Sequence, residues 1–307
     1  MIMDYSYYYM DVIKDAAKLH YDIFISAFDG CERTTIIYNK VCAENKYWLV
    51  FPQYVQDACV LPDKYLTSSA LMEDEYIPNV IETMDLSNKT ICIDSTGFLI
   101  PHLLFLIKYL QRRNILNFDI LYSEPISYAK AEDTEFTKNV NVPRPIEGYM
   151  ASAKNVNGND ALIIFSGFDD TLMTVVARNN SKALYKYLFT GFPSLQADMY
   201  QQNLIQLNKS KESIGETHVS YLKAPAYDPF VAANKLQKIV NELMDDKYNI
   251  EYIHVSPLST KPMAIAAALV YLNNRNCPID IIYPPADIYY CEHTVGIKRT
   301  WKYTIEL

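Results

Sequence analysis

Short apolar runs alternate with amphipathic stretches along almost the whole of this 307-residue chain. Short continuous apolar runs are typical of strands in a parallel sheet, and amphipathic stretches are typical of the helices that cover it. The alternation predicts an α/β protein with largely parallel sheets and helices on both faces. Expected strands are 21–28, 46–52, 89–94, 118–124, 160–168, 186–192, 218–224, 250–256 and 278–284; expected helices are 31–44, 76–84, 99–113, 170–179, 194–208, 229–246 and 261–274.

Two segments of the first half resemble two segments of the second half, and they come in the same order. The tetrapeptide Ser26–Asp29 (SAFD) matches Ser166–Asp169 (SGFD), and residues 91–125 match 253–286. In the longer match Ser95-Thr96 falls on Ser259-Thr260, and Gly97 falls on Lys261. The simplest alternative is that any two strand–helix–strand units look alike.

The repeated pattern predicts two diverged Rossmann-like units, in residues 1–125 and 160–307. The two matches are offset by 140 and 164 residues, so the second copy should hold an extra element, which we place at strand 218–224. The alternating C-terminal residues 299–307 predict an edge strand or hairpin added to the second unit. The polar segment 126–159 connects the units and is either a linker or a lid, with a protein partner as a further possibility.

Charge and composition exclude several classes of protein. The net charge of −8 argues against duplex nucleic acid as a partner, because such binding needs a basic face. There are only 8 glycines, and neither GxGxxG nor GxxxxGK[ST] occurs. The six cysteines form no CxxC pair or zinc-site spacing, which favours reduced thiols. We see no signal peptide and no membrane-spanning run, so we expect a cytoplasmic protein that does not enter a membrane.

Polar side chains follow most of the expected strands. In open α/β sheets, ligands bind beyond the carboxyl ends of the strands, so these positions are the candidate binding residues. They are Asp29, Arg33, Asp94, Ser95 and Thr96 in the first half, and Asp169, Asp170, Ser194, Ser259, Thr260 and Lys261 in the second.

The sharpest candidate is the strand–turn–helix segment 254–270. Ser259 or Thr260 is expected to cap the following helix, Lys261 adds a positive charge, and Pro262 suits a first helical turn. Free amides and the positive end of the helix dipole favour an anion such as a phosphate. The alternative is an ordinary capped helix with a solvated lysine.

Ser259-Thr260-Lys261 resembles the Gly-Thr-Lys turn of CARF-type Rossmann-like sensor domains, with serine in place of glycine, over about 30 residues. The resemblance implies sensing of a nucleotide and no catalysis. Residues 21–26 (YDIFIS) also resemble the opening strand of TIR domains, but the segment bearing the catalytic glutamate of those domains has no counterpart in this sequence.

The paired carboxylates Asp29/Glu32 and Asp169/Asp170 suit either catalysis or helix capping. Such pairs can act as acid and base, and Mg²⁺ is possible at Asp169 and Asp170; more commonly they stabilise the start of a helix. Arg33 can present its guanidinium to an anion or form a surface ion pair. In 191–203, Ser194 is an expected N-cap, and the nearby aromatics either flank a purine-like ring or pack in the core.

Together these features predict a protein that binds or senses a nucleotide-like anion at the strand ends between the two units. The first alternative is a hydrolase or transferase acting on a nucleotide or nucleoside, with Asp29, Asp94 and Asp169 as its carboxylates. The second is a non-catalytic protein-interaction module that uses residues 126–159.

Overall fold

The computed structural model describes residues 4–54, 60–128, 137–290 and 294–307, and it confirms the predicted α/β class. The chain divides into two compact units whose bounds differ from the predicted ones. The first-half unit consists of Tyr8–Lys138 and Asp287–Leu307, and the second-half unit consists of Asn139–Ala286 with the N-terminal residues up to Tyr7. The difference arises at the C-terminus, which returns to the first-half unit instead of completing the second.

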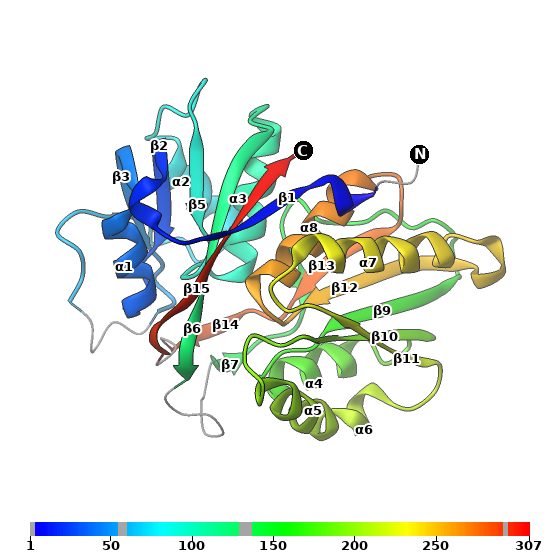
Figure 1. Ribbon diagram of the computed structural model, residues 1–307. Helices are drawn as coiled ribbons and strands as arrows, with labels where there is room; N and C mark the ends of the chain where they lie inside the picture. Colours follow the sequence, from blue (N-terminus) through cyan, green and yellow to red (C-terminus); the bar gives the residue numbers. More distant parts are fainter. Residues whose placement is uncertain (1–3, 55–59, 129–136, 291–293) are drawn as a thin grey trace. The chain divides into compact units, whose positions relative to one another are not determined.

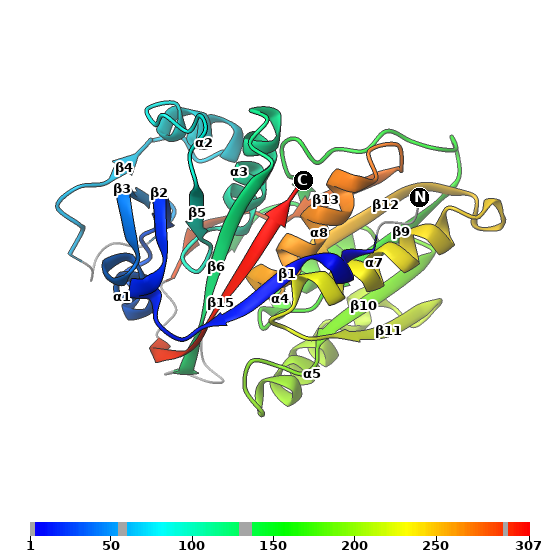
Figure 2. The ribbon, with the colours of Figure 1, turned by 45° about the horizontal axis from the view of Figure 1, so that its top comes forward.

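The first-half unit contains a sheet with strand order β1-β15-β6-β5-β2-β3-β4. The five neighbouring strands β6, β5, β2, β3 and β4 run parallel to one another. Strand β15 is antiparallel to both β6 and β1 (Figure 2). Its strands are β1 (Tyr9–Ile13), β2 (His20–Ala27), β3 (Cys42–Val50), β4 (Leu66–Thr67), β5 (Ile91–Asp94), β6 (Asn117–Tyr128) and β15 (Thr294–Glu306). Its helices are α1 (Glu32–Lys40), α2 (Glu73–Ile81) and α3 (Ile100–Arg112).

Strand β15 corrects the expectation of an edge strand in the second unit, because it lies inside the first-half sheet. The side chains of Trp301, Tyr303 and Ile305 alternate along it and are buried. Alternation of this kind shows that a strand has one buried face, but it does not identify the sheet that the strand joins.

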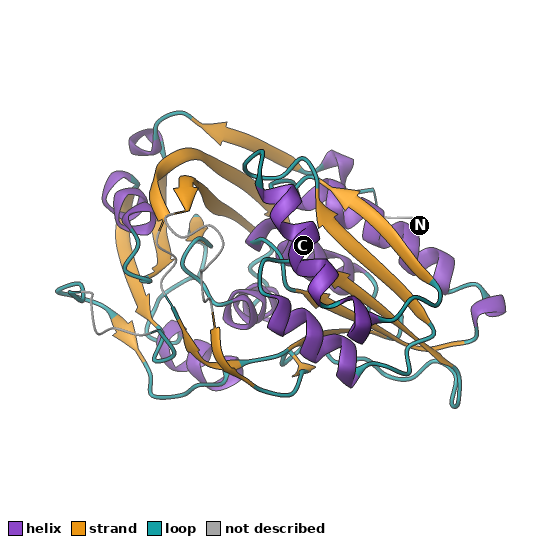
Figure 3. Ribbon diagram, turned by 90° about the horizontal axis from the view of Figure 1, so that it is seen from below, coloured by secondary structure: helices purple, strands orange, loops and turns teal. Residues whose placement is uncertain are grey.

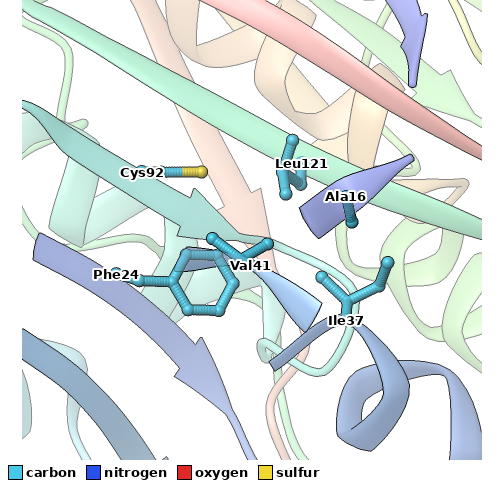
Figure 4. Packing of buried hydrophobic residues seen from close by; sticks show 6 residues of the cluster. All are labelled: Ala16, Phe24, Ile37, Val41, Cys92 and Leu121. Carbon is cyan, nitrogen blue, oxygen red and sulfur yellow. The ribbon is translucent and has the colours of Figure 1, made fainter. Parts of the chain in front are cut away.

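Right-handed crossovers set the positions of the helices. The connection from β2 through α1 to β3 moves along the sheet in one direction, and those through α2 and α3 move in the other. Helix α1 therefore covers one face, and α2 and α3, which pack together, cover the opposite face. Figure 4 shows six buried residues of the core on the α1 side: Ala16, Phe24, Ile37, Val41, Cys92 and Leu121.

The second-half unit contains a sheet of order β11-β10-β9-β12-β13-β8, which is parallel except for β8. Helices α7 and α8 lie on one face, and α4, α5 and α6 lie on the other (Figure 1). Figure 3 shows these helices running along the strands. The strands are β8 (Arg144–Pro145), β9 (Asn159–Phe165), β10 (Tyr185–Gly191), β11 (Val219–Ala224), β12 (Ile250–Pro257) and β13 (Ile279–Tyr283). The helices are α4 (Asp170–Asn179), α5 (Met199–Lys209), α6 (Lys211–Ile214), α7 (Pro229–Leu243) and α8 (Lys261–Asn273).

The parallel strands of both units follow the same order. If only the parallel strands are numbered, in chain order within each unit, both sheets have the strand order 3-2-1-4-5. In each sheet an antiparallel strand lies beside the fifth parallel strand. This is the order of doubly wound sheets. Strand β4 occupies the place of β11, so the expectation that 218–224 is an extra element is wrong. In the second-half unit, α5 and α6 lie between β10 and β11.

In each unit, the backbone at the end of the first parallel strand crosses very close to the backbone that follows the fourth. In the first-half unit a Cβ on Gly97 would lie 2.2 Å from the Ala27 oxygen, and in the second-half unit a Cβ on Gly167 would lie 1.9 Å from the Leu258 oxygen. Because no side chain fits at either crossing, each unit needs a glycine there. The first-half unit places it after the fourth strand, and the second-half unit places it after the first.

These crossings and the helix starts correct the predicted match between Gly97 and Lys261. Helix α3 begins at Ile100 and α8 begins at Lys261, and each has proline in its second position. The structural counterpart of Lys261 is therefore Ile100, and the counterpart of Gly97 is Leu258. The loop between β5 and α3 is longer than the loop between β12 and α8. The alignment of the two sequences alone placed these extra loop residues at the wrong position.

The segment 126–159 is partly built into secondary structure. Strand β7 (Thr137–Val140) pairs with β14 (Ala286–Tyr289), and β8 forms the edge of the second-half sheet. Ile146 and Tyr149 are fully buried, so residues 139–159 are packed into the second-half unit and do not form a lid. Residues 129–136 lie outside the described part of the chain. No helix among the described residues is long and apolar enough to cross a membrane.

Candidate functional site

A small pocket lies at the carboxyl ends of β9, β10, β11 and β12 in the second-half unit. The space inside it is about 20 Å³, room for about one water molecule. This is far below the roughly 300 Å³ at which ligand pockets begin. The pocket therefore suits one small group of a ligand whose remainder lies at the mouth. Its lining consists of Ser166, Phe168, Gly191, Ser194, Leu195, Met199, Asn203, Ala226, Ser259 and Thr260.

Asn203 on α5 holds one wall of this pocket. Its Nδ2 donates to the carbonyl oxygens of Ser166 at 3.0 Å and Gly167 at 2.6 Å, which fixes the orientation of the amide. Its Oδ1 lies 2.9 Å from Ser166 Oγ and shares the single proton of that hydroxyl with the Phe189 oxygen at 2.8 Å. Asn203 is buried, so these bonds satisfy polar groups that water does not reach.

Three hydroxyls of the lining donate their protons to oxygens of the protein itself. Ser166 Oγ lies 2.8 Å from the Phe189 oxygen, Thr260 Oγ1 lies 2.5 Å from the Ala226 oxygen, and Ser194 Oγ bonds the Gln196 oxygen. A carbonyl oxygen only accepts, so each hydroxyl must donate in these contacts. What they retain are lone pairs, which suit the hydroxyl or amino group of a ligand.

The start of α8 carries the remaining polar groups at the fourth strand end. Thr260 occupies the N-cap position, but its hydroxyl caps no amide of the helix, contrary to the expected role. Ser259 is half-buried, and its hydroxyl has no hydrogen-bond partner among the residues that the structure describes. Lys261 is the first residue of α8 and is half-buried. Ser259 thus adds a donor to the lining, and Lys261 follows the lining residue Thr260 in sequence but is not itself part of the lining.

Ser194 is not the N-cap that the sequence predicted. Helix α5 begins only at Met199, and Asp198 stands at the N-cap position without a capping bond. Ser194 instead bonds the backbone of the turn that leads to the helix. Serine commonly bonds its own turn in this way, which makes it a poor marker of where a helix starts.

The predicted residues of the first half also come together, at the ends of β2, β5 and β6, but they are buried. Asp29, Arg33, Asp94, Ser95 and Thr96 all have at most 7% of their surface exposed. Arg33 bonds other residues of the same unit: its guanidinium donates to the Ser123 carbonyl at 2.6 Å and to Thr294 Oγ1 at 2.9 Å. We therefore interpret these five residues as a structural polar network.

The carboxylates of this network are engaged by their own chain. Asp29 Oδ1 accepts from the Cys31 amide at 3.0 Å and from the Thr34 hydroxyl at 2.7 Å. Asp94 accepts from the Thr96 amide and the Ser26 hydroxyl. Burial of Asp94, together with the charge of Asp29, raises its pKa to about 6 against these hydrogen bonds, which lower it.

Asp169 in the second-half unit caps a helix. Its Oδ1 accepts from the Thr171 and Leu172 amides at 3.0 and 3.2 Å, while Asp170 is the first residue of α4. Asp169 thus follows the capping alternative, and Mg²⁺ at Asp169 and Asp170 stays a hypothesis. Within the described ranges, no group of three or more His, Cys, Asp or Glu side chains could hold a metal ion.

Asn203 and Ser166 are polar residues of the pocket that the sequence reasoning did not name as candidates. Asparagine is a weak helix former, yet Asn203 lies on the buried stripe of α5, four residues from both Met199 and Leu207. A polar side chain on an apolar stripe at this spacing is a signal of a buried hydrogen-bonding role. Comparison with known proteins adds no assignment, because no family model and no curated protein matches the sequence.

Proposed function

We propose that the protein binds a small nucleotide-like ligand at the strand ends of the second-half unit. The observation that carries this proposal is the position of the pocket between the ends of β9 and β12, the first and fourth strands. The order of an open α/β sheet reverses at that point, and such sheets bind their ligands there. Ser259 and Thr260 from one strand end and Ser166 from the other line the same hollow.

The groups around the pocket define the chemistry of the ligand. The lining hydroxyls donate to carbonyl oxygens of the chain, so their remaining lone pairs favour a ligand with hydroxyl or amino donors. Lys261 and the positive end of the α8 dipole favour an anionic group. A sugar phosphate combines both features, which supports a nucleotide or a related compound.

Binding or sensing is proposed ahead of turnover. Asp29, Asp94 and Asp169, the carboxylates of the enzyme alternative, accept hydrogen bonds from their own chain. A catalytic carboxylate must come within hydrogen-bond reach of a substrate proton, and Asp94 has no exposed surface. We further propose that the two units are diverged copies, a view supported by their shared strand order and their matching glycine crossings.

Calorimetric titration with nucleoside monophosphates tests the site. Lys261→Ala should weaken binding at least about tenfold, because a hydrogen bond to a charged group contributes roughly 1.5–3 kcal/mol. Lys209→Ala, at the exposed end of α5, is the matched control and should bind as the wild type does. Unchanged affinity in folded Lys261→Ala would refute the site, and a new product in the mixture by mass spectrometry would favour the enzyme.

A further inference from the structure

Two aromatic rings and a lysine lie next to the pocket lining. Phe192 directly follows Gly191 of the lining, and Tyr200 directly follows Met199. The two ring centroids are 5.0 Å apart, with the ring planes inclined at 59°. The ammonium nitrogen of Lys223 is 5.0 Å from the Phe192 ring centroid and 4.9 Å from that of Tyr200.

Paired backbone holds this cluster in place. Lys223 on β11 lies opposite Thr190 on β10, and the pairing continues where the Phe192 amide donates to the Ala224 oxygen at 2.7 Å. Tyr200 lies in the first turn of α5. All three side chains thus start from regular secondary structure or from its direct continuation, which favours a preformed surface over a loose loop.

The cluster leaves apolar surface in water. Phe192 is 48% exposed, and covering its ring with another planar group would remove that surface from water. Every nucleobase has a π face that can stack on an aromatic side chain, whichever base it is. The ammonium of Lys223 adds a positive charge that attracts the phosphate of a nucleotide.

We propose that Phe192, Tyr200 and Lys223 form a stacking platform for the base of a nucleotide whose sugar hydroxyls enter the neighbouring pocket. This inference rests on the proposed function and deepens it, because it names the part of the ligand that lies outside the small pocket. A pocket with room for about one water molecule cannot hold a base, so the base needs a surface at the mouth. Recognition by stacking predicts tolerance among the four bases.

The test compares ligands with and without a base. Titration calorimetry measures the binding of AMP, GMP, CMP, UMP and ribose 5-phosphate to the full chain. Each nucleotide should bind more tightly than ribose 5-phosphate, by about 5- to 150-fold for one stacked base. Phe192→Ala and Tyr200→Ala should each reduce this difference and leave the affinity for ribose 5-phosphate unchanged.

Tyr221→Ala is the matched control. Tyr221 lies two residues before Lys223 on β11 and is 65% exposed, but its ring lies outside the cluster. This variant should keep the full preference for nucleotides, and far-UV circular dichroism confirms that each variant is folded. An equal loss in Tyr221→Ala would indicate a general apolar surface and would overturn the platform.

The possible failures are distinguishable. If ribose 5-phosphate binds and the nucleotides bind no more tightly, the platform is refuted while the proposed function stands. If Phe192→Ala weakens ribose 5-phosphate and AMP by the same factor, the ring shapes the pocket and does not stack a base, which also overturns the platform. If none of the five compounds binds, both proposals fail.

Discussion

Replacing Asp94 with asparagine should remove a pH dependence from the stability of the first-half unit. Asp94 ends β5, has no exposed surface, and has a pKa of about 6 because burial disfavours its charged form. An aspartate in an unfolded chain titrates near 3.9. The folded protein therefore holds this proton more tightly than the unfolded chain does.

The sign of the effect follows from proton linkage. Between about pH 4 and pH 6 the folded state binds more protons at Asp94 than the unfolded state, so the free energy of unfolding falls as the pH rises. A difference of about two pKa units corresponds to about 3 kcal/mol. This contribution is complete below about pH 4 and is lost as the pH rises through 6.

Asparagine stays neutral across this range. At position 94 it keeps an oxygen for the Thr96 amide, and its amide group can donate to the hydroxyl oxygen of Ser26, which now donates to Asp94. This exchange of hydrogen bonds changes the free energy of unfolding by an amount that does not depend on pH. From pH 4 to pH 7, Asp94→Asn should therefore gain about 3 kcal/mol of stability relative to the wild type.

Urea unfolding followed by tryptophan fluorescence measures this gain directly. The two tryptophans, Trp48 and Trp301, both lie in the first-half unit with Asp94, so their signal reports on that unit. Exposed Asp63 lies in the same unit, and Asp63→Asn should follow the wild-type curve. If Asp94→Asn and the wild type keep the same pH slope between 4 and 7, the reasoning about burial is wrong.

Three further predictions concern the second-half unit, with stability measured by chemical unfolding followed by circular dichroism. Asn203→Leu leaves two buried carbonyls without their donor and should lower stability by about 2–4 kcal/mol, whereas exposed Asn208→Leu should change it by less than about 0.5 kcal/mol; equal effects would refute the role of Asn203. Gly167→Ala places a Cβ 1.9 Å from a backbone oxygen and should cost about 3 kcal/mol or abolish folding, so a fully stable variant would contradict the crossing. Burial lowers the pKa of His254, but the 2.8 Å hydrogen bond and the charge of Asp280 raise it above its usual 6.5 overall. The pair therefore contributes its full stabilisation below about pH 6.5, and this contribution is lost as the pH rises through the raised pKa of His254. Asp280→Asn should abolish this pH dependence in unfolding curves from about pH 5.5 to 8.5.

Local periodicity was enough to predict the class of the fold and most of its elements. Helix α4 spans the predicted residues 170–179, and each of the nine expected strands has a counterpart within a few residues. An apolar run indicates a strand that is buried on both faces, and an amphipathic stretch indicates a helix that is buried on one face. Both patterns can be recognised from residues that are close together in the sequence. Short elements such as β4 and β8, two residues each, escaped because two residues show no period.

The sequence also identified where polar groups gather, but not what they do there. Ser194, Ser259 and Thr260 lie at one pocket as expected from their positions after strands, since the ends of parallel strands share one edge of a sheet. The same rule placed Asp29 and Asp94 at strand ends, yet both are buried in a structural network. Exposure depends on what covers a strand end, and the covering residues come from distant parts of the chain.

By itself, the sequence determined the α/β class and the alternation of strands and helices, because both follow from the pattern of neighbouring residues. Only the tertiary structure decided that β15 joins the first-half sheet, that Asn203 forms a wall of the pocket, and that the lining hydroxyls donate to oxygens of their own chain. Each of these depends on a partner remote in sequence: Trp301 lies opposite Tyr122, and Thr260 bonds Ala226. Pairings of this kind are selected by packing across the whole unit, which no local pattern records.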